Sequence, residues 1–110
     1  MTADLEVSRF QKRPAYRYIR AADGLPATSA VNADSLALVK LFNPTGAGTW
    51  YLAGYDPQDR VAWGLADLGM EPEYGCIGME ELVEFRGRFG LPIERDLHWT
   101  PRPLRECGTR

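Results

Sequence analysis

The residues best suited to chemistry lie close together near the C-terminus. His98 is the only histidine among the 110 residues, and it follows Asp96 and Glu94 at intervals of two residues. On a strand, such intervals place the imidazole and both carboxylates on one face. A histidine beside carboxylates can act as a general base or contribute to a metal site. Without an HxxxH or CxxC partner, however, the pattern favours a polar, solvent-facing row of a strand.

Other candidate catalytic groups have weaker support. Pairing Cys76 with His98 would require a spatial contact that the sequence does not establish, and a lone cysteine in a strand is usually a packing residue. The loop NPTGAG at residues 43–48 contains glycines but joins two apolar runs and lacks the GK[ST] ending of a phosphate-binding loop. We therefore predict no metal and no cofactor, and we expect a non-enzymatic protein.

The elements that would position these residues are organised around residues 36–68. Three apolar runs, LALVKLF, TWYLAGY and RVAWGLADL, are separated by the turn-forming loops NPTGAG and DPQD. This pattern predicts an antiparallel meander. The first loop predicts the strand pairs Phe42–Thr49, Leu41–Trp50 and Val39–Leu52.

The second loop sets the rest of the predicted register. With residues 56–59 as the loop, the expected pairs are Tyr55–Arg60, Leu52–Trp63 and Trp50–Leu65. Side chains alternate between the two faces of a sheet. The two hairpins therefore agree on one core-facing set of residues, namely Trp50, Leu52, Trp63 and Leu65.

The opposite face of this predicted meander is rich in tyrosine. Tyr51 and Tyr55 stand there above small residues, together with Lys40. Another segment can cover this face and make it a second core layer, which is the usual fate of a strand that is apolar on both faces. Alternatively, Tyr51 and Tyr55 form an aromatic shelf on which a ligand or partner rests. Our candidate binding residues are Tyr51, Tyr55, Trp99 and His98.

The remaining elements complete the predicted fold. Residues 79–86 have apolar positions at helical spacing, and Gly87 suits the helix end. Residues 93–100 alternate as a final strand. We predict an α+β domain, with an antiparallel meander sheet of four to five strands and one main helix packed on it. The expected boundaries are a basic N-terminal arm at 1–24, a single domain at 25–106 and a tail at 107–110.

The N-terminal arm differs in charge from the rest of the chain. Residues 1–23 contain five basic residues against three acidic ones, whereas the whole chain has a net charge of −2. The basic residues are Arg9, Lys12, Arg13, Arg17 and Arg20. Interleaved aromatic residues would allow nucleic-acid binding by phosphate contacts and stacking. Five cations are few and Pro14 interrupts any helix, which favours a solvated arm or a strand ending near Ile19.

The cellular setting follows from what the sequence lacks. No apolar stretch is long enough for a transmembrane helix, and the start MTADLEVSRF has no signal-peptide core. We expect a cytoplasmic protein with no membrane partner.

Several blocks carry a family resemblance. LVKLFNPTGAGTWYLAGYDP, GLADLG, EPEYG, GMEELVEFRG and GLPIERDLHWTPRPLRE resemble the family called domain of unknown function 2958. The resemblance spans residues 25–106 and leaves residues 1–24 outside. Gly54 and the pair Gly78 and Met79 depart from the family pattern. The resemblance implies a small bacterial protein of a kind often encoded on plasmids and mobile elements, and it implies no catalytic residue.

Three classes of function remain open. The first is a non-enzymatic protein-interaction protein of a bacterial mobile element, which engages a host or element-encoded protein. By analogy alone, this class includes anti-defence inhibitors of restriction or CRISPR machinery. The second is a nucleic-acid-associated module that uses the basic arm. The third is a small enzyme centred on His98, Asp96 and Glu94.

Overall fold

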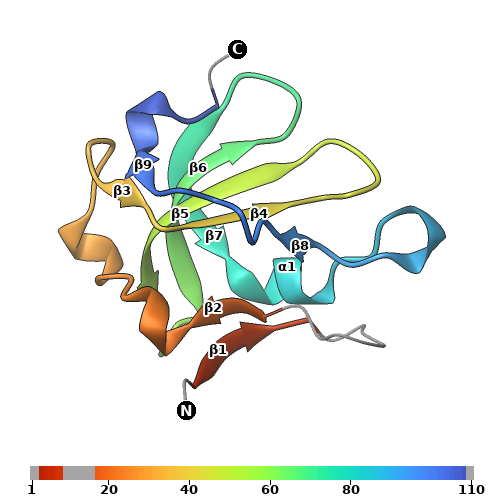
Figure 1. Ribbon diagram of the computed structural model, residues 1–110, viewed down its shortest axis with the longest axis horizontal. Helices are drawn as coiled ribbons and strands as arrows, with labels where there is room; N and C mark the ends of the chain where they lie inside the picture. Colours follow the sequence, from red (N-terminus) through yellow and green to blue (C-terminus); the bar gives the residue numbers. More distant parts are fainter. Residues whose placement is uncertain (1–2, 9–16, 109–110) are drawn as a thin grey trace.

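A five-stranded antiparallel sheet forms the centre of the computed structural model, which describes residues 3–8 and 17–108 (Figure 1). The strand order is β7-β6-β5-β4-β8. The strands are β4 (Val39–Phe42), β5 (Thr49–Asp56), β6 (Val61–Asp67), β7 (Glu73–Gly78) and β8 (Glu94–Arg95). The first four are neighbours both along the chain and in space, which confirms the predicted antiparallel meander.

The helical part of the domain is small. Within the described residues there is a single α-helix, α1 (Met79–Glu84), which buries Met79, Leu82 and Val83. It is shorter than the predicted 79–86 because Phe85 leaves helical geometry, with φ −64° and ψ 139°. The described segments also contain four short 3-10 turns, namely η1 (Ala21–Asp23), η2 (Thr28–Ala30), η3 (Arg88–Gly90) and η4 (Leu104–Glu106). None of the helices in the described segments combines the length and apolar character needed to cross a bilayer.

The hairpin between β4 and β5 has the predicted register. Val39 pairs with Leu52, Leu41 with Trp50 and Phe42 with Thr49. The turn is stabilised by Asn43, whose Oδ1 accepts the backbone N–H of Thr45 at 3.0 Å and whose Nδ2 donates to the carbonyl of Ala47 at 3.2 Å. Asparagine commonly organises a turn in this way.

The predicted register of the second hairpin is wrong. Gly54 pairs with Trp63 and Leu52 with Gly64, with a β-bulge at Ala53 between these pairs. The turn begins one residue later than predicted, since Asp56 pairs with Val61 and Arg60 closes the turn at φ +54°. A bulge inserts one residue into one strand only and so redirects the side chains beyond it.

The bulge redistributes the aromatic residues between the two faces. Trp50 and Leu52 lie on the predicted core face, but Trp63 and Leu65 belong to the core on the other face. At Gly64 the two strands approach closely, and a Cβ atom there would stand 1.8 Å from the carbonyl oxygen of Tyr51. Any residue with a Cβ atom would require the two strands to shift at that crossing.

The main core lies between one face of the sheet, α1 and an N-terminal strand pair. The strands β1 (Asp4–Val7) and β2 (Arg17–Arg20) run antiparallel and lie side by side next to α1 (Figure 1). Tyr18 and Ile19 are fully buried, and the hydroxyl of Tyr18 donates to the carbonyl of Ile93 at 2.6 Å. The described part of residues 1–24 is therefore packed on the domain.

A second, smaller core lies on the opposite face of the sheet. Short strands β3 (Leu36–Ala37) and β9 (Arg102–Pro103) pair above it, and η4 follows directly. Leu104 is fully buried and Cys107 is buried beside it. This layer covers the sheet face that carries Tyr51, and Cys107 of the predicted tail is part of it.

The predicted final strand at residues 93–100 is mostly wrong. Only Glu94 and Arg95 pair with β4. The Oδ1 of Asp96 accepts the backbone N–H of His98 at 2.9 Å, and the N–H of Trp99 bonds the carbonyl of Asp96 at 3.4 Å. An aspartate that bonds its own backbone two residues later replaces strand geometry with a turn.

Candidate functional site

Residues 96–101 form an arch over β4. On one side of the arch Arg95 pairs with Leu41, and on the other Arg102 pairs with Ala37. The six residues 96–101 therefore lie opposite only the three residues 38–40. The longer segment must bow away from the sheet. Two bonds fix it there, from the Asp96 N–H to the carbonyl of Lys40 at 3.0 Å and from the Trp99 Nε1–H to the carbonyl of Ala37 at 2.8 Å. Leu97 lies on this arch and is 78% exposed, so the arch presents it to solvent.

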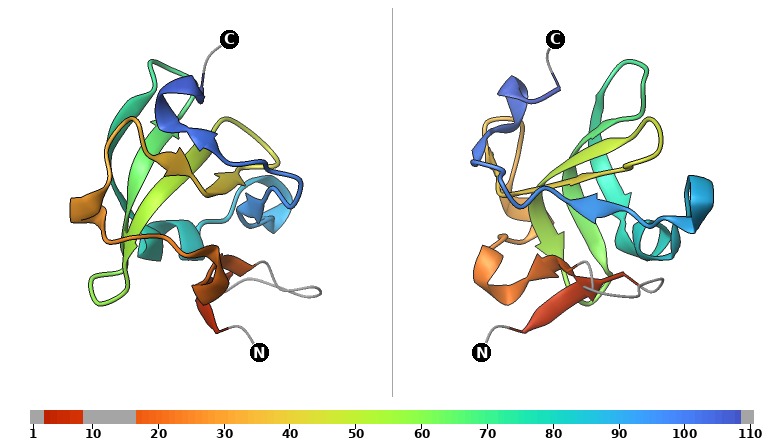
Figure 2. Two further views of the ribbon diagram at one scale, coloured as in Figure 1. Left: turned by 60° about the vertical axis from the view of Figure 1, so that its left-hand side comes forward. Right: turned by 45° about the vertical axis from the view of Figure 1, so that its right-hand side comes forward.

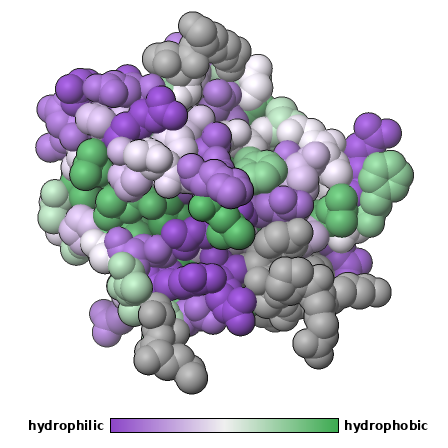
Figure 3. Space-filling model, viewed as in Figure 1, coloured by the Kyte–Doolittle hydropathy of each residue, from purple (hydrophilic) through white to green (hydrophobic). Residues whose placement is uncertain are grey.

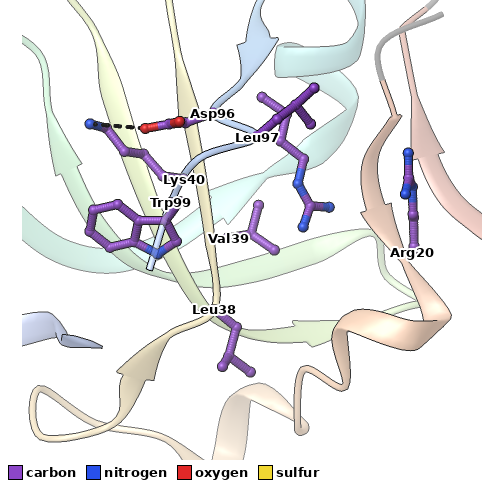
Figure 4. A pocket seen from close by; sticks show the side chains of 8 residues that line it. Arg20, Leu38, Val39, Lys40, Asp96, Leu97 and Trp99 are labelled. Carbon is purple, nitrogen blue, oxygen red and sulfur yellow. Dashed lines mark ion pairs between the residues drawn. The ribbon is translucent and has the colours of Figure 1, made fainter. Parts of the chain in front are cut away.

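A shallow groove of about 210 Å³ lies along the arch. We call it the Trp99 groove, and its lining residues are Arg20, Leu38, Val39, Lys40, Arg95, Asp96, Leu97 and Trp99. Figure 4 shows Arg20 on β2 across the groove from Trp99, with Lys40 beside the indole ring. On the molecular surface, apolar residues run across this face between hydrophilic bands (Figure 3). The groove itself is lined by both apolar and charged side chains, and most of its exposed lining is polar.

Trp99 is the anchor of the groove. Its ring centroid lies 5.5 Å from that of Tyr51, 5.4 Å from the Lys40 Nζ and 4.8 Å from the Arg102 Cζ. Cations at such distances are attracted to the ring quadrupole of an indole. Because its N–H is also bonded to the backbone, Trp99 is held in one orientation while part of its surface faces the groove.

The cations of the groove have carboxylate partners. Lys40 lies 3.6 Å from Asp96, and Arg95 forms a two-pronged pair with Asp23 at 2.8 Å for each bond. Burial works against the Asp23 carboxylate, but hydrogen bonds from Arg95 and from the backbone N–H of Arg20 outweigh it and lower the pKa of Asp23. Arg20 is held least tightly. Its Nε is buried without a hydrogen bond among the described residues and lies 3.8 Å from Asp4.

A second, smaller pocket of about 100 Å³ adjoins the groove on the side of Tyr51. Lys40 and Trp99 line both hollows, and Arg102 and Cys107 contribute to the smaller one. Burial raises the pKa of the Tyr51 phenol and also that of the Cys107 thiol. A buried thiol with a raised pKa is a poor nucleophile, so Cys107 is a packing residue.

Comparison with known proteins bears on the family and not on the activity. The family model described as protein of unknown function DUF2958 matches residues 15–105. The chain belongs to this family. No curated protein matches the sequence, and no solved structure matches it. The DUF2958 match begins earlier than the expected residue 25, so it includes β2, while β1 lies outside it.

The arch changes the expected arrangement of the predicted catalytic residues. The Asp96 carboxylate bonds backbone N–H and faces Lys40, the His98 side chain is exposed, and Glu94 lies on β8 before the turn. The common strand face on which the imidazole and both carboxylates were expected is not formed. Within the described residues no group of three or more His, Cys, Asp and Glu side chains could hold a metal ion.

The aromatic shelf that was the alternative interpretation for Tyr51 and Tyr55 is not formed either. The bulge at Ala53 places these tyrosines in different cores. Tyr55 is buried, and its hydroxyl donates to the Oε2 of Glu6 at 2.6 Å. Tyr51 is half-buried against Trp99. Of the four candidate binding residues, the structure therefore brings Tyr51 and Trp99 together.

The basic residues of the N-terminal arm divide into two groups. Arg9, Lys12 and Arg13 lie outside the described residues. Arg17 donates to Asp4 at 2.9 Å, and Arg20 lies near the same carboxylate and on the wall of the Trp99 groove.

The sequence prediction missed Lys40, Leu97 and Arg95 as groove residues. Lys40 carried a usable signal, because it is the single charge within the apolar run LALVKLF. Leu97 and Arg95 gave none, since their placement depends on the length of the arch relative to β4. Regular alternation placed Leu97 opposite the solvent-facing row of Asp96 and His98, whereas the structure has a turn at Asp96 and an exposed Leu97.

Proposed function

We propose that this DUF2958 protein is a non-enzymatic interaction protein that binds another protein through the Trp99 groove. The observation that carries the proposal is Leu97, an apolar side chain exposed at the tip of an arch whose backbone is fixed by hydrogen bonds. Exposed apolar side chains on a rigid support, beside a half-buried aromatic anchor and charged side chains, are the usual composition of a protein-binding surface.

The size of the groove supports a macromolecular ligand. Its volume of about 210 Å³ lies below the roughly 300–1,000 Å³ of sites that enclose a small molecule or cofactor. A groove of this size accommodates one or two side chains of a partner. The rest of the interface would then extend over the exposed surface around Leu97.

The charges favour a protein over a nucleic acid. Lys40 and Arg95 are already engaged by Asp96 and Asp23, so they have little positive potential left for a phosphate backbone. Arg20 is paired more loosely, because its Nε lies 3.8 Å from the Asp4 carboxylate and its side chain is 42% exposed. We therefore expect the partner to place an apolar side chain against Leu97 and Trp99 and one carboxylate near Arg20.

The biological setting of the proposal comes from the family resemblance. We propose a cytoplasmic protein of a bacterial mobile element that engages a host or element-encoded protein. Inhibition of restriction or CRISPR machinery is the anti-defence form of this proposal, and its support is analogy with proteins of mobile elements. Identification of the protein that the chain binds would show whether the anti-defence form is correct.

Affinity capture from a bacterial lysate, with and without nuclease treatment, tests the proposal. The bait is the full chain, compared with Leu97→Asp and with Phe89→Asp. Phe89 is a matched control because it is 87% exposed and does not line the groove. We expect the wild type and Phe89→Asp to retain the same stoichiometric partner and Leu97→Asp to lose it.

Other outcomes contradict the proposal in distinct ways. Capture that disappears with nuclease would support the nucleic-acid module instead. Equal retention by Leu97→Asp would place the interface elsewhere. A lysate activity that the purified protein reproduces and that His98→Ala abolishes would support the enzyme.

A further inference from the structure

The strand β7 forms one outer edge of the central sheet. It pairs with β6 along its whole length, from Val61–Gly78 to Ala66–Glu73, without a bulge. In the described part of the chain no strand pairs with its other side (Figure 2). This edge lies on different residues from the Trp99 groove.

The hydrogen-bond pattern identifies which groups of β7 point outward. The Met79 N–H donates to the carbonyl of Arg60 at 2.9 Å, which marks these two residues as a hydrogen-bonded pair of the antiparallel ladder. Bonded and non-bonded pairs alternate along such a ladder. The backbone N–H and C=O groups of Tyr74, Cys76 and Gly78 are therefore directed away from β6 and are available to another strand.

This edge has few of the features that prevent strand addition. Natural edge strands are usually blunted by lysine, proline, a bulge or extreme shortness. The β7 sequence EYGCIG has no lysine or proline, runs for six residues and carries one charge, Glu73 at its first position. A regular edge of this kind is suited to the addition of an extended segment.

An apolar shelf lies beside the edge. The Trp63 and Tyr74 rings are stacked, with centroids 6.0 Å apart and planes at 8°. Tyr74 is 46% exposed, and Cys76 on the same sheet face is exposed. Alternate side chains of an added strand would pack on these two residues, so the shelf adds side-chain contacts to the backbone bonds.

The charge around β7 specifies the occupant. Residues 68–84 contain five acidic residues and no basic residue. Glu71 precedes β7, Glu73 is its first residue, and Glu80, Glu81 and Glu84 follow on α1. A cation close to the end of β7 is Arg60, which lies beside Met79, interacts with Glu80 and is already paired with Glu6. In an antiparallel pair of two copies, the start of one β7 would lie beside the end of the other. Glu73 of one copy would then approach Glu80 of the second, and like charges facing each other destabilise strand pairing. A partner segment with basic residues at its ends would instead stabilise the strand pairing, because its charges are opposite to those of Glu73 and Glu80.

We propose that β7 accepts an extended, basic segment of a partner protein as an added strand. The segment bonds the outward groups of Tyr74, Cys76 and Gly78. It places apolar or β-branched side chains on the Trp63–Tyr74 shelf and lysine or arginine near Glu73 and Glu80.

Phage-displayed random octapeptides panned on the full chain provide the test. We expect selected peptides to be rich in lysine, arginine and β-branched or aromatic residues and to lack proline. Their synthetic forms are then titrated against Cys76→Pro and Cys76→Ala. Proline removes an N–H that the ladder with β6 does not use, and an edge strand tolerates it there. We expect Cys76→Pro to weaken binding by about fivefold to tenfold and Cys76→Ala to leave it unchanged.

Two further measurements keep the test decisive if Cys76→Pro is poorly folded. The double variant Glu71→Lys/Glu73→Lys should weaken the basic peptides, and peptide binding should slow amide exchange at Tyr74, Cys76 and Gly78. Selected peptides without basic enrichment, or amide protection elsewhere only, would overturn the proposal. A dimer in light scattering that Cys76→Pro or the charge reversal alters would assign the edge to a second copy and overturn it as well.

Discussion

Replacing Glu6 with glutamine tests how the N-terminal strand is attached to the domain. The Glu6 side chain is only 1% exposed, yet it lies on β1, outside the DUF2958 match. Its carboxylate accepts hydrogen bonds from the Tyr55 hydroxyl at 2.6 Å, the Arg60 Nε at 3.0 Å and the Arg60 Nη2 at 2.8 Å. This cluster connects β1 to the hairpin between β5 and β6.

The expected loss of stability follows from these contacts. Removing one member of a fully buried ion pair costs about 3–5 kcal/mol. The Arg60 side chain is 40% exposed, so water can solvate it after the substitution and the loss is smaller. Glutamine keeps one carbonyl oxygen for the Tyr55 hydroxyl but loses the charge. Since a hydrogen bond to a charged group contributes about 1.5–3 kcal/mol, we expect Glu6→Gln to lower the free energy of unfolding by about 2 kcal/mol.

Urea denaturation at neutral pH measures this difference, with Glu81→Gln as the control because Glu81 is exposed on α1. The control should change stability by less than about 0.5 kcal/mol. Glu6→Gln should also lower the melting temperature by about 8 °C, at about 4 °C per kcal/mol for a domain of this size. If Glu6→Gln unfolds within about 0.5 kcal/mol of the wild type, the attachment of β1 through this cluster is refuted.

Three further substitutions test the packing and the charges. Gly64→Ala brings a Cβ atom against the Tyr51 carbonyl, so we expect a loss of about 3 kcal/mol or no folded protein, measured by thermal denaturation. Leu104→Ala empties a fully buried position of the second core and should cost about 3 kcal/mol in urea denaturation; a loss below about 1 kcal/mol would contradict the packing of η4. Asp23→Asn should destabilise the protein at pH 7 by about 2 kcal/mol. Because the folded pKa of Asp23 lies below its ordinary 3.8, this contribution is present above about pH 4 and is lost as the pH falls through the folded pKa. Denaturation at pH 7 and pH 3 should therefore show the gap between wild type and Asp23→Asn shrinking in acid, and a constant gap would contradict the assignment.

The first hairpin could be predicted from the sequence and the second could not. Residues 43–48 contain the asparagine and glycines that such a turn requires, so the register of β4 with β5 followed directly. In the second hairpin the DPQD cluster marked the turn correctly to within one residue. The residue types at Ala53 and Arg60 do not indicate a bulge or a left-handed backbone conformation, so neither feature could be predicted.

Of the residues that line the candidate groove, Trp99 could be selected from the sequence and its neighbours could not. Trp99 was identified as a candidate binding residue, and the structure places it in a groove. The sequence of residues 93–100 does alternate between apolar and polar residues. However, the Asp96 side chain accepts a hydrogen bond from the His98 N–H, and the resulting turn ends the strand and leaves Leu97 exposed. Contacts such as Arg95 with Asp23 join segments far apart in the chain, so periodicity within one segment could not reveal them.

Site-specific photo-crosslinking in bacterial cells tests the central claim most directly. A photoreactive phenylalanine analogue replaces Leu97 in one variant and Phe89 in another, since both positions are exposed and only the first lines the Trp99 groove. If the groove is a protein-binding surface, position 97 should give one reproducible protein adduct that position 89 does not give. Equal adducts from both positions, or none from position 97, would contradict it.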